Sequence, residues 1–287
     1  MIDVVVLNYN DYNTTSEFVD EMITNQSINH ILVVDNNSTD NSYIKLKKRE
    51  NERVHVIKTD HNGGYGYGNN YGVKTCVQLY KSKYVLICNP DTIIKNDSIE
   101  AMHQCLECNK EACVVTCVMT DADKKDSGVS AWRIPSFSEI IMHNLIWPEK
   151  VLSKGYKYYN TNTYNKKVLE VDCVQGSLYM VNARKFLKIG GFDEGVFLYN
   201  EENILGIRNR KNHNKVFLLT GFVYIHHHSV SIDKTFTTYY SKWKQSWSSQ
   251  KYMLKKYYHA NYIMVTIAYV SMLIRLIQVY IKKYLMK

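Results

Sequence analysis

The chain has 287 residues, of which 45% are hydrophobic and 22% are charged, and its formal net charge is +9. These fractions are ordinary for a globular protein, and the length allows one large α/β domain with an appendage or two small domains. The chain opens with the strand-like MIDVVVLNYN in place of a basic and then apolar leader. We therefore expect no secretory signal, and we expect the seven cysteines to be thiols in a reducing compartment.

The first ninety residues predict alternating strands and helices. Short apolar runs predict strands over residues 2–7, 31–34, 54–57 and 84–88. Helical apolar periodicity or cap residues predict helices over about 14–25, from 43 onward, and over about 71–81. This alternation is typical of a doubly wound α/β sheet.

Polar clusters follow three of these strands, at 8–10, 35–40 and 89–91. The carboxyl ends of the strands meet at one edge of such a sheet, where ligands bind. Asp91 follows Asn89-Pro90, and a carboxylate there could hold a hard divalent cation against a diphosphate. The alternative is that Asp91 only begins a turn.

A glycine-rich segment at 62–70 precedes the third predicted helix. Its spacing is not the G-x-G-x-x-G of dinucleotide-binding proteins, and it follows the third strand instead of the first. A glycine-rich backbone before a helix can still cradle phosphate, and a mobile surface loop is the alternative.

Four cysteines, at 105, 108, 113 and 117, raise the question of a zinc site. The gap between Cys108 and Cys113 is shorter than the loop that usually separates structural zinc pairs. We favour packing roles on a predicted helix at 100–109 and a predicted strand at 112–119.

From 120 to 165 the periodicity weakens, and aromatic residues such as Trp132 lie among polar ones. Long irregular stretches are often binding loops or lids, so this region is expected to cover a site or receive a second substrate. Regular elements are then predicted again. Strands are expected over 168–174, 178–181, 216–219 and 222–225, and helices over 183–189 and about 201–210.

Two groups in this second half could carry chemistry. Glu201 and Glu202 begin a predicted helix, where both could be ordinary first-turn charges or one could point into a cleft. In the run His226-His227-His228, alternation along an extended chain places only His226 and His228 on one side. One of them could bind metal or phosphate together with Asp91.

In this order the motifs resemble glycosyltransferase family 2, especially its rhamnosyltransferase-like branch of capsule or O-antigen synthesis. The matching segments are VVVLNYN at 4–10, VVDNNSTD at 33–40, NGGYGYGNN at 62–70, NPD at 89–91, QGSLYMV at 175–181, GGFDEGVFLYNEENILGIR at 190–208 and HHHSVS at 226–231. The resemblance implies a GT-A fold over residues 1–232. In that fold residues 1–92 form the nucleotide-binding half and residues 93–232 form the acceptor-binding half.

The resemblance also implies roles for individual residues. Asp91 matches the last carboxylate of the family's D-x-D metal motif, although the first position here is Asn89. Glu202 matches the general base, with Glu201 as an alternative, and Gly176 and Trp132 are expected near the acceptor. His226 or His228 matches a late histidine near the metal and the diphosphate. Residues expected near the nucleotide are Asn8, Tyr9, Asp35, Asn62, Gly63, Gly68, Asn69 and Asn89.

The implied reaction is an inverting sugar transfer from a nucleotide-diphosphate sugar, such as a UDP-hexose or dTDP-rhamnose, to a hydroxyl of a glycan acceptor, expected to be lipid-linked. A carboxylate takes the proton of the attacking hydroxyl, and Mg²⁺ or Mn²⁺ near Asp91 stabilises the departing diphosphate.

Residues 233–287 form a basic tail, which has no acidic residue after Asp233 and ten lysines and arginines. Within it, 263–281 is apolar and ends at Lys282-Lys283, but its uninterrupted part, 263–274, is too short to span a bilayer. We favour an interfacial amphipathic helix on the cytoplasmic leaflet, which implies a cytoplasmic protein held peripherally at the inner face of the plasma membrane. Packing of this helix on the domain or in a dimer is the alternative, and a tilted span is the least favoured.

Two other functions remain open from the sequence. One is another nucleotide-binding enzyme on a doubly wound fold, such as an oxidoreductase. The other is a nucleic-acid-binding protein, which the tail charge alone supports, because the tail has no recognisable nucleic-acid motif. We expect no nucleic acid among the partners, and the sequence does not predict the oligomeric state.

Overall fold

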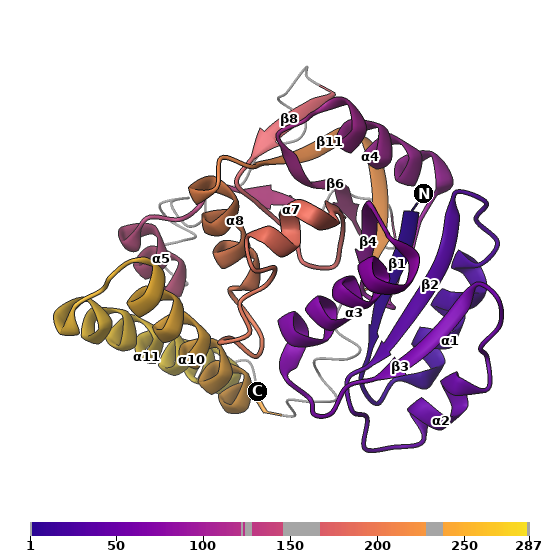
Figure 1. Cartoon of the computed structure of the whole chain (residues 1–287). Coiled ribbons are helices and arrows are strands. Elements are labelled where there is room, and N and C mark those ends of the chain that lie inside the picture. The colour runs from indigo at the N-terminus through magenta and orange to yellow at the C-terminus, as the bar shows by residue number, and fades with distance from the viewer. Residues whose placement is uncertain (1, 122, 124–127, 146–166, 228–237, 286–287) are drawn as a thin grey trace.

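A computed structural model describes residues 2–121, 123, 128–145, 167–227 and 238–285. One central sheet has helices on both faces, and a group of C-terminal helices lies at the side of the molecule away from the first strands (Figure 1). The predicted domain boundary at 232 lies outside the described residues.

The N-terminal half of the sheet is entirely parallel. It contains β1 (Ile2–Asn8), β2 (Ile28–Asp35), β3 (Val54–Lys58) and β4 (Tyr84–Cys88), in the spatial order β3-β2-β1-β4. The direction in which strands are added therefore reverses between β1 and β4. In open α/β sheets, the crevice outside the carboxyl ends of the strands at such a switch point is where ligands bind.

The second half of the sheet is mixed. It continues from β4 through β10 (Leu178–Asn182), β6 (Ala112–Thr120) and β11 (Lys215–His226) to β5 (Thr92–Ile94), and β8 (Val168–Val171) also pairs with β11. β6 and β11 are parallel, whereas β10, β5 and β8 run antiparallel to their neighbours. The sheet is thus doubly wound in its first half, as predicted, and mixed beyond it.

Three strand predictions differ from the structure in detail. The separate strands expected at 216–219 and 222–225 form the single strand β11, with a register shift between Leu219 and Val223. The strand expected at 168–174 divides into β8 and β9 (Cys173–Val174). β9 leaves the main sheet and pairs with β7 (Ala131–Trp132), inside the segment whose periodicity is weak.

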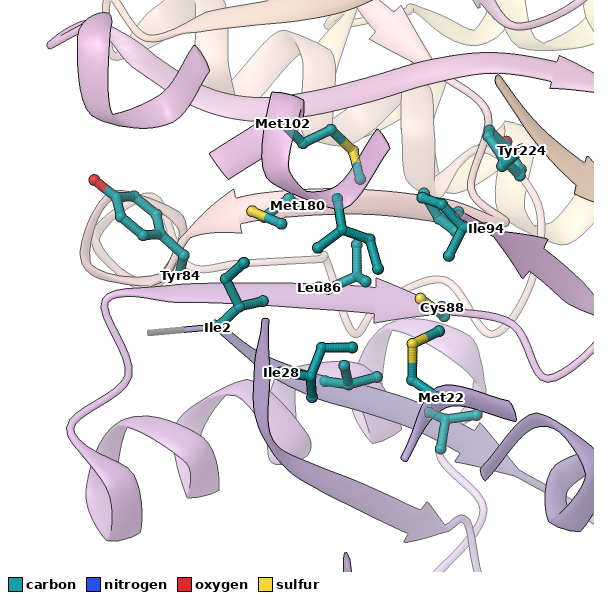
Figure 2. Packing of buried hydrophobic residues seen from close by; sticks show 14 of the residues in the cluster. Ile2, Met22, Ile28, Tyr84, Leu86, Cys88, Ile94, Met102, Met180 and Tyr224 are labelled. Atoms are coloured by element: carbon teal, nitrogen blue, oxygen red, sulfur yellow. The ribbon is translucent and has the colours of Figure 1, made fainter. Parts of the chain in front are cut away.

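Two hydrophobic layers enclose the sheet. On one face α1 (Tyr12–Met22), α2 (Ser42–Lys47) and α4 (Asn96–Cys108) pack on residues such as Leu86, and Figure 2 shows Met22 and Met102 among the buried side chains of this layer. On the other face α3 (Gly64–Tyr80), α7 (Ala183–Lys188) and α8 (Glu201–Lys211) pack on residues such as Val5 and Ile87. Burial on both faces explains why the strands are apolar without interruption.

The glycine-rich segment is helical, which corrects the prediction that the helix begins near 71. α3 begins at Gly64, and its glycines lie against neighbouring elements. A Cβ atom on Gly68 would lie 2.3 Å from Leu7 Cδ1, and one on Gly72 would lie 2.5 Å from Val5 Cγ1. These glycines therefore let the helix approach β1 closely, and from Gly64 onward the segment is part of a helix instead of a surface loop.

The C-terminal helices form a third, smaller core. α5 (Phe137–Asn144), α10 (Tyr239–Tyr257) and α11 (Tyr262–Leu285) surround Ile140, Met253, Leu254 and Ala268, together with Ile204 of α8. α5 and α10 both begin with a capping box, at Ser136 and Thr238. The predicted tail helix at 263–281 is part of α11, and α10 precedes it.

α11 keeps most of its apolar surface exposed. Within its segment Tyr262–Lys283, an 18-residue stretch has a mean hydropathy of 1.8, and only 17% of that stretch is buried. By length and composition this segment could cross a membrane, whereas the uninterrupted run at 263–274, considered alone, is too short. The exposed apolar residues are Tyr262, Ile263, Ile267, Tyr269, Val270, Ile274, Ile277, Tyr280 and Ile281.

Candidate functional site

A cavity of about 330 Å³ opens at the carboxyl ends of β1 and β4, which is the switch point of the sheet. We call it the switch-point cavity. Its wall includes Tyr9 from the end of β1, Asn89 and Asp91 from the end of β4, and Asn62 from the segment before α3. The other lining residues are Leu7, Asn36, Gly64, Tyr65, Pro90, Gln175, Gly176, Ser177, Phe197, Leu198, Tyr199, Asn200, Glu201, Glu202 and His226.

Asp91 and His226 meet in this cavity. β5 follows Asp91 directly and pairs antiparallel with the end of β11, so that His226 lies opposite Thr92. His226 Nε2 is 3.3 Å from Asp91 Oδ1, and both side chains are largely buried. The third predicted metal ligand, His228, lies outside the described residues. The structure thus brings together two of the three residues expected around a cation.

Glu201 and Glu202 begin α8 and both line the switch-point cavity. Burial raises the pKa of Glu201, and the charge of Glu202 raises it further. Burial also raises the pKa of Glu202, although hydrogen bonds from the backbone amides of Glu202 and Gly176 oppose the change. A carboxylate with a raised pKa is a stronger base than one in water, which suits the removal of a proton from a hydroxyl.

A left-handed backbone stands directly before these two acids. Tyr199 and Asn200 precede α8 and have φ angles of +73° and +68°. Asparagine tolerates the left-handed region, whereas tyrosine rarely adopts it. Left-handed conformations of this kind cost energy and occur preferentially where the surrounding structure positions a functional group.

Asn8 and Asp35 do not line the cavity, although the sequence places both near the nucleotide. Both are fully buried, and Asn8 Nδ2 donates to Asp35 Oδ2 at 2.7 Å. Asp35 Oδ1 accepts from the Ser38 amide at 2.8 Å, and Asn8 Oδ1 accepts from Thr15 Oγ1 at 2.9 Å. This polar cluster joins the segments that follow β1 and β2. Asn8 and Asp35 therefore support the residues of the cavity wall without lining the cavity themselves.

Of the residues predicted in the glycine-rich segment, only Asn62 lines the cavity. Gly63, Gly68 and Asn69 are not among its lining residues. Asn69 is fully buried, and its Nδ2 donates to the Tyr65 carbonyl within α3. Gly64 and Tyr65, which were not predicted, line the cavity in their place.

A further residue that sequence reasoning missed is Asn36, whose Nδ2 bonds Asn62 Oδ1 at 2.9 Å and the Gly64 carbonyl at 3.0 Å. Its position directly after Asp35, at the end of the second strand, is the signal that could have identified it.

A second cavity of about 360 Å³ lies between α5, α8, α10 and α11, and we call it the helical cavity. Tyr199, Asn200 and Glu202 line both cavities, so Glu202 stands in the wall between them. The remaining lining residues are Trp132, His143, Asn144, Asn203, Tyr239, Lys242, Trp243, Ser246, Gln250, Met272 and Arg275.

The two predicted acceptor residues border different cavities. Gly176 lines the switch-point cavity, where a Cβ atom would lie 2.8 Å from Glu202 Oε1. Trp132 lines the helical cavity, and its indole Nε1 donates to Asn203 Oδ1 at 2.8 Å. Both residues are therefore next to Glu202 or its neighbour on α8.

The profile of Glycosyl transferase family 2 matches residues 3–181, which is more than half of the chain. The chain belongs to this family. The resemblance found in the motifs is thereby confirmed, and the oxidoreductase alternative has no support. All the switch-point residues up to Ser177 lie within the matched segment, whereas the two glutamates of α8 lie after it.

Two relatives of this family 2 protein are rhamnosyltransferases. It is 28% identical over 148 residues to rhamnosyltransferase WbbL of Escherichia coli, covering 50% of this chain and 53% of WbbL. It is 27% identical over 191 residues to N-acetylglucosaminyl-diphospho-decaprenol L-rhamnosyltransferase of Mycobacterium tuberculosis, covering 62% of this chain and 60% of that protein. The chain thus spans little more than half the length of these relatives.

A solved structure shows the same GT-A fold. The mannosyltransferase PcManGT from Pyrobaculum calidifontis, in complex with GDP-Man and Mn²⁺, matches with a TM-score of 0.58 at 12% identity. The match covers 94% of this chain and 73% of PcManGT. The predicted fold class is therefore confirmed.

The described residues fit a divalent cation bound partly by substrate. Among the described ranges, no group of three or more His, Cys, Asp or Glu side chains could hold a metal. Asp91 and His226 supply one carboxylate and one imidazole at the cavity wall. Mg²⁺ at nucleotide sites commonly takes one or two carboxylates and completes its coordination with phosphate oxygens and water, and this pair is consistent with that arrangement.

Proposed function

We propose that this chain is an inverting glycosyltransferase. It would transfer a sugar from a nucleotide-diphosphate sugar to a hydroxyl of a glycan acceptor. The observation that carries this proposal is the position of Glu202, a partly buried carboxylate with a raised pKa in the wall between two cavities. One cavity lies at the switch point, where nucleotides bind in open α/β sheets, and the other lies on the opposite side of the same carboxylate.

In the proposed reaction the acceptor hydroxyl approaches Glu202 from the helical cavity. Its oxygen forms a bond to the anomeric carbon while its proton passes to the Glu202 carboxylate. The bond between the anomeric carbon and the diphosphate oxygen breaks, and its electron pair leaves with the nucleoside diphosphate. One displacement at one carbon inverts the anomeric configuration. Glu202 is favoured over Glu201 because Glu201 lines only the switch-point cavity.

The donor's diphosphate would lie near Asp91, His226 and the first turn of α3, which all border the switch-point cavity. The N-terminus of a helix favours an anion through its amides and its dipole. Mg²⁺ or Mn²⁺ held by Asp91 and His226 would supply positive charge to the departing diphosphate. Tyr9, Asn36, Asn62 and Asn89 would contact the nucleoside or the phosphates.

For the donor we propose dTDP-rhamnose first and a UDP-hexose second, because two relatives are named as rhamnosyltransferases. For the acceptor we propose a lipid-linked saccharide of bacterial surface-polysaccharide synthesis. The mycobacterial relative, whose name includes a diphospho-decaprenol, supports this choice.

The test is Glu202→Gln in the full chain, with Glu201→Gln as the matched variant. Transfer of labelled sugar from dTDP-rhamnose and from UDP-hexoses to a bacterial lipid extract is measured, together with the rise in melting temperature caused by dTDP or UDP and Mn²⁺. We expect Glu202→Gln to lower kcat about a thousandfold while nucleotide binding persists. Transfer at the wild-type rate by Glu202→Gln would overturn the assignment of the base. The absence of a shift with any nucleotide would overturn the function.

We also propose that α11 holds the protein at the inner face of the plasma membrane. Its exposed apolar residues, with Lys282 and Lys283 at the end, support this, since such a helix binds an interface through apolar area and basic charge. We expect the chain to float with vesicles that contain anionic phospholipid, and Ile267→Glu with Ile274→Glu to abolish flotation. Flotation by this double variant equal to that of the wild type would contradict the proposal.

A further inference from the structure

The carboxylate of Glu202 lies against the backbone of Gly176. A Cβ atom on Gly176 would be 2.8 Å from Glu202 Oε1, and the Gly176 amide donates a hydrogen bond to this carboxylate. Gly176 stands in the connection 175–177 between β9 and β10. The direction of the proposed base therefore depends on a glycine, the residue whose backbone has the most conformational freedom.

Other elements hold both ends of this connection. The Gln175 amide donates to the Ser130 carbonyl at 3.1 Å. The Ser177 carbonyl accepts from the Asn89 amide at 2.7 Å. These bonds fix the ends of the connection, so the peptide group between them is fixed only when the Gly176 carbonyl is also bound.

Tyr65 binds this carbonyl. Its hydroxyl donates to the Gly176 carbonyl oxygen. Burial raises the pKa of Tyr65 well above its ordinary value, so the hydroxyl keeps its proton near neutral pH and remains a donor. The tyrosine ring packs edge-on against Phe192, with the ring centroids 5.4 Å apart. Ring packing therefore holds the hydroxyl in place.

The backbone of Tyr65 holds the chain that leads to Glu202. Its amide donates to the Phe197 carbonyl at 3.0 Å, and Phe197 belongs to the segment before α8. One residue in the first turn of α3 thus contacts both the connection against which the Glu202 carboxylate lies and the segment that carries Glu202. A side chain in this position can set the direction of the carboxylate through Gly176.

We propose that Tyr65 is a positioning residue for the base of the transfer reaction. Its hydroxyl fixes the peptide group that follows Gly176, and the Gly176 amide then directs the Glu202 carboxylate toward the acceptor hydroxyl. This inference rests on the proposed function, because it takes Glu202 as the base. Positioning matters here because a base must stay within hydrogen-bonding reach of the proton that it removes.

The first test is Tyr65→Phe in the full chain, with Tyr67→Phe as the matched control. Tyr67 also lies on α3, and its hydroxyl donates to Asp60 outside the lining of the switch-point cavity. Transfer of labelled sugar from dTDP-rhamnose and from UDP-hexoses to a bacterial lipid extract is measured. We expect Tyr65→Phe to lower kcat about tenfold without a change in the KM for the donor, and Tyr67→Phe to behave like wild type. An equal kcat in the two variants would overturn the proposal.

A double-mutant cycle separates the positioning of Glu202 from a general structural role. If Tyr65 acts through the Glu202 carboxylate, Tyr65→Phe has no further effect once Glu202→Gln has removed the proton acceptor. We expect the kcat of the double variant to lie within about twofold of that of Glu202→Gln alone. A further tenfold loss would show that Tyr65 acts elsewhere, which would overturn this inference and leave Glu202 as the base.

Titration of the Glu202 carboxyl gives a readout that needs no acceptor. In protein labelled with carboxyl-¹³C glutamate, the NMR signal that is missing from Glu202→Gln identifies Glu202. The Gly176 amide stabilises the charged carboxylate, so loosening this amide should raise the pKa of Glu202 in Tyr65→Phe and leave it unchanged in Tyr67→Phe. The acidic limb of the pH profile of kcat should move to higher pH in the same variant, because the base acts only when it has lost its proton.

Neither substitution alters a charge near Glu202. The side chains that can carry a charge near neutral pH and share a cavity with Glu202 are Asp91, His143, Glu201, His226, Lys242 and Arg275, and both variants retain them. A shift in Tyr65→Phe alone is therefore due to the lost hydrogen bond. An identical titration in Tyr65→Phe and wild type would overturn the positioning role. If the titration shifts but the wild-type protein transfers no sugar from any donor, the proposed function fails while the effect of Tyr65 on the Glu202 carboxylate stands.

Discussion

Two buried aspartates hold the two walls of the candidate site by different means. Asp35, behind the N-terminal wall, accepts from the Asn8 amide group and the Ser38 backbone amide. Asp193, behind the C-terminal wall, accepts from Tyr252, Lys256 and Tyr257 of α10 and lies 3.1 Å from Arg208 of α8. Neutral donors thus hold the first wall, whereas at the second wall Lys256 of α10 and Arg208 of α8 add positive charge to the neutral tyrosine donors.

The difference reflects what each wall must join. The Asp35 cluster joins segments that leave adjacent parallel strands, so the backbone already brings the partners together. α8 and α10 are separated by a long stretch of chain, and among the described residues Ile204 is the one buried side chain of α8 in the small core that contains Met253 and Leu254 of α10. Charged side chains therefore determine how α10 docks on α8, whereas backbone pairing between strands brings the segments together in the N-terminal half.

The largest stability effect is expected where the two walls meet, at Gly64. Its φ is +87°, and a Cβ atom there would lie 2.1 Å from the Phe197 carbonyl oxygen. Gly64→Ala should lower the free energy of unfolding by about 4 kcal/mol, because it combines an unfavourable φ with a backbone clash.

Urea denaturation measures this effect, and Gly128→Ala is the matched control. Gly128 also has a positive φ, of +69°, but no atom of the described residues lies within 4 Å of its added Cβ. Gly128→Ala therefore measures the effect of backbone strain alone, and it should lower the free energy of unfolding by about 1 kcal/mol. Equal losses from the two substitutions would show that the contact between α3 and the segment before α8 contributes nothing.

Asp193→Asn is expected to lower the free energy of unfolding by less, about 2 to 3 kcal/mol. It removes charged hydrogen bonds, while Lys256 and Arg208 stay partly exposed to water. The loss should shrink in 1 M NaCl, where charge interactions are screened. A loss that is independent of salt would indicate that packing, and not charge, joins α10 to the rest of the protein.

The same network predicts a dependence on pH. Burial alone would raise the pKa of Asp193, but hydrogen bonds from Tyr257, Lys256 and the Gly195 amide, with the charge of Arg208, hold it well below its ordinary value of 3.8. Its stabilising contribution is therefore complete above that ordinary value and is lost as the pH falls toward the lowered one. The gap in unfolding free energy between wild type and Asp193→Asn should be constant near neutral pH and narrow below about pH 4.

Asp35→Asn is expected to lower the free energy of unfolding by about 1 to 2 kcal/mol, because only one hydrogen bond is lost. This is less than the losses expected for Gly64→Ala and Asp193→Asn. The new amide would face the Asn8 amide, donor against donor, while the bond to Ser38 persists. This loss should not change with salt. If Asp35→Asn proves more salt-sensitive than Asp193→Asn, the contrast between the two walls is wrong.

The sequence predicted the N-terminal wall well because its signals are local. Tyr9, Asn89 and Asp91 follow apolar runs, and strand ends in a parallel sheet converge on one edge. The same reasoning placed Asn8 and Asp35 near the nucleotide but did not predict that they bond each other behind the wall, since a strand end does not reveal which side chains pair. It also predicted a loop at 62–70, where α3 packs its glycines against β1.

The helical cavity could not be predicted in the same way. Trp132, Lys242 and Arg275 come from separate elements, and only tertiary packing brings them to one space. The left-handed backbone at Tyr199 carries no sequence signal, because tyrosine rarely adopts it. The sequence pattern singled out Glu201 and Glu202 as a pair, and the resemblance to a family favoured Glu202, but neither predicted its place between two cavities.

Glu202 lies after the part of the chain that the family profile covers, and this has a consequence for evolution. The family profile ends at residue 181, and most residues of the helical cavity, including Lys242 and Arg275, lie after that point. If the helical cavity receives the acceptor as proposed, natural selection for a new acceptor can act on α10 and α11 without disturbing the strand ends that form the switch-point cavity. Lineages that exchange or remodel this C-terminal segment would diversify their glycans while they keep one inherited nucleotide-binding sheet.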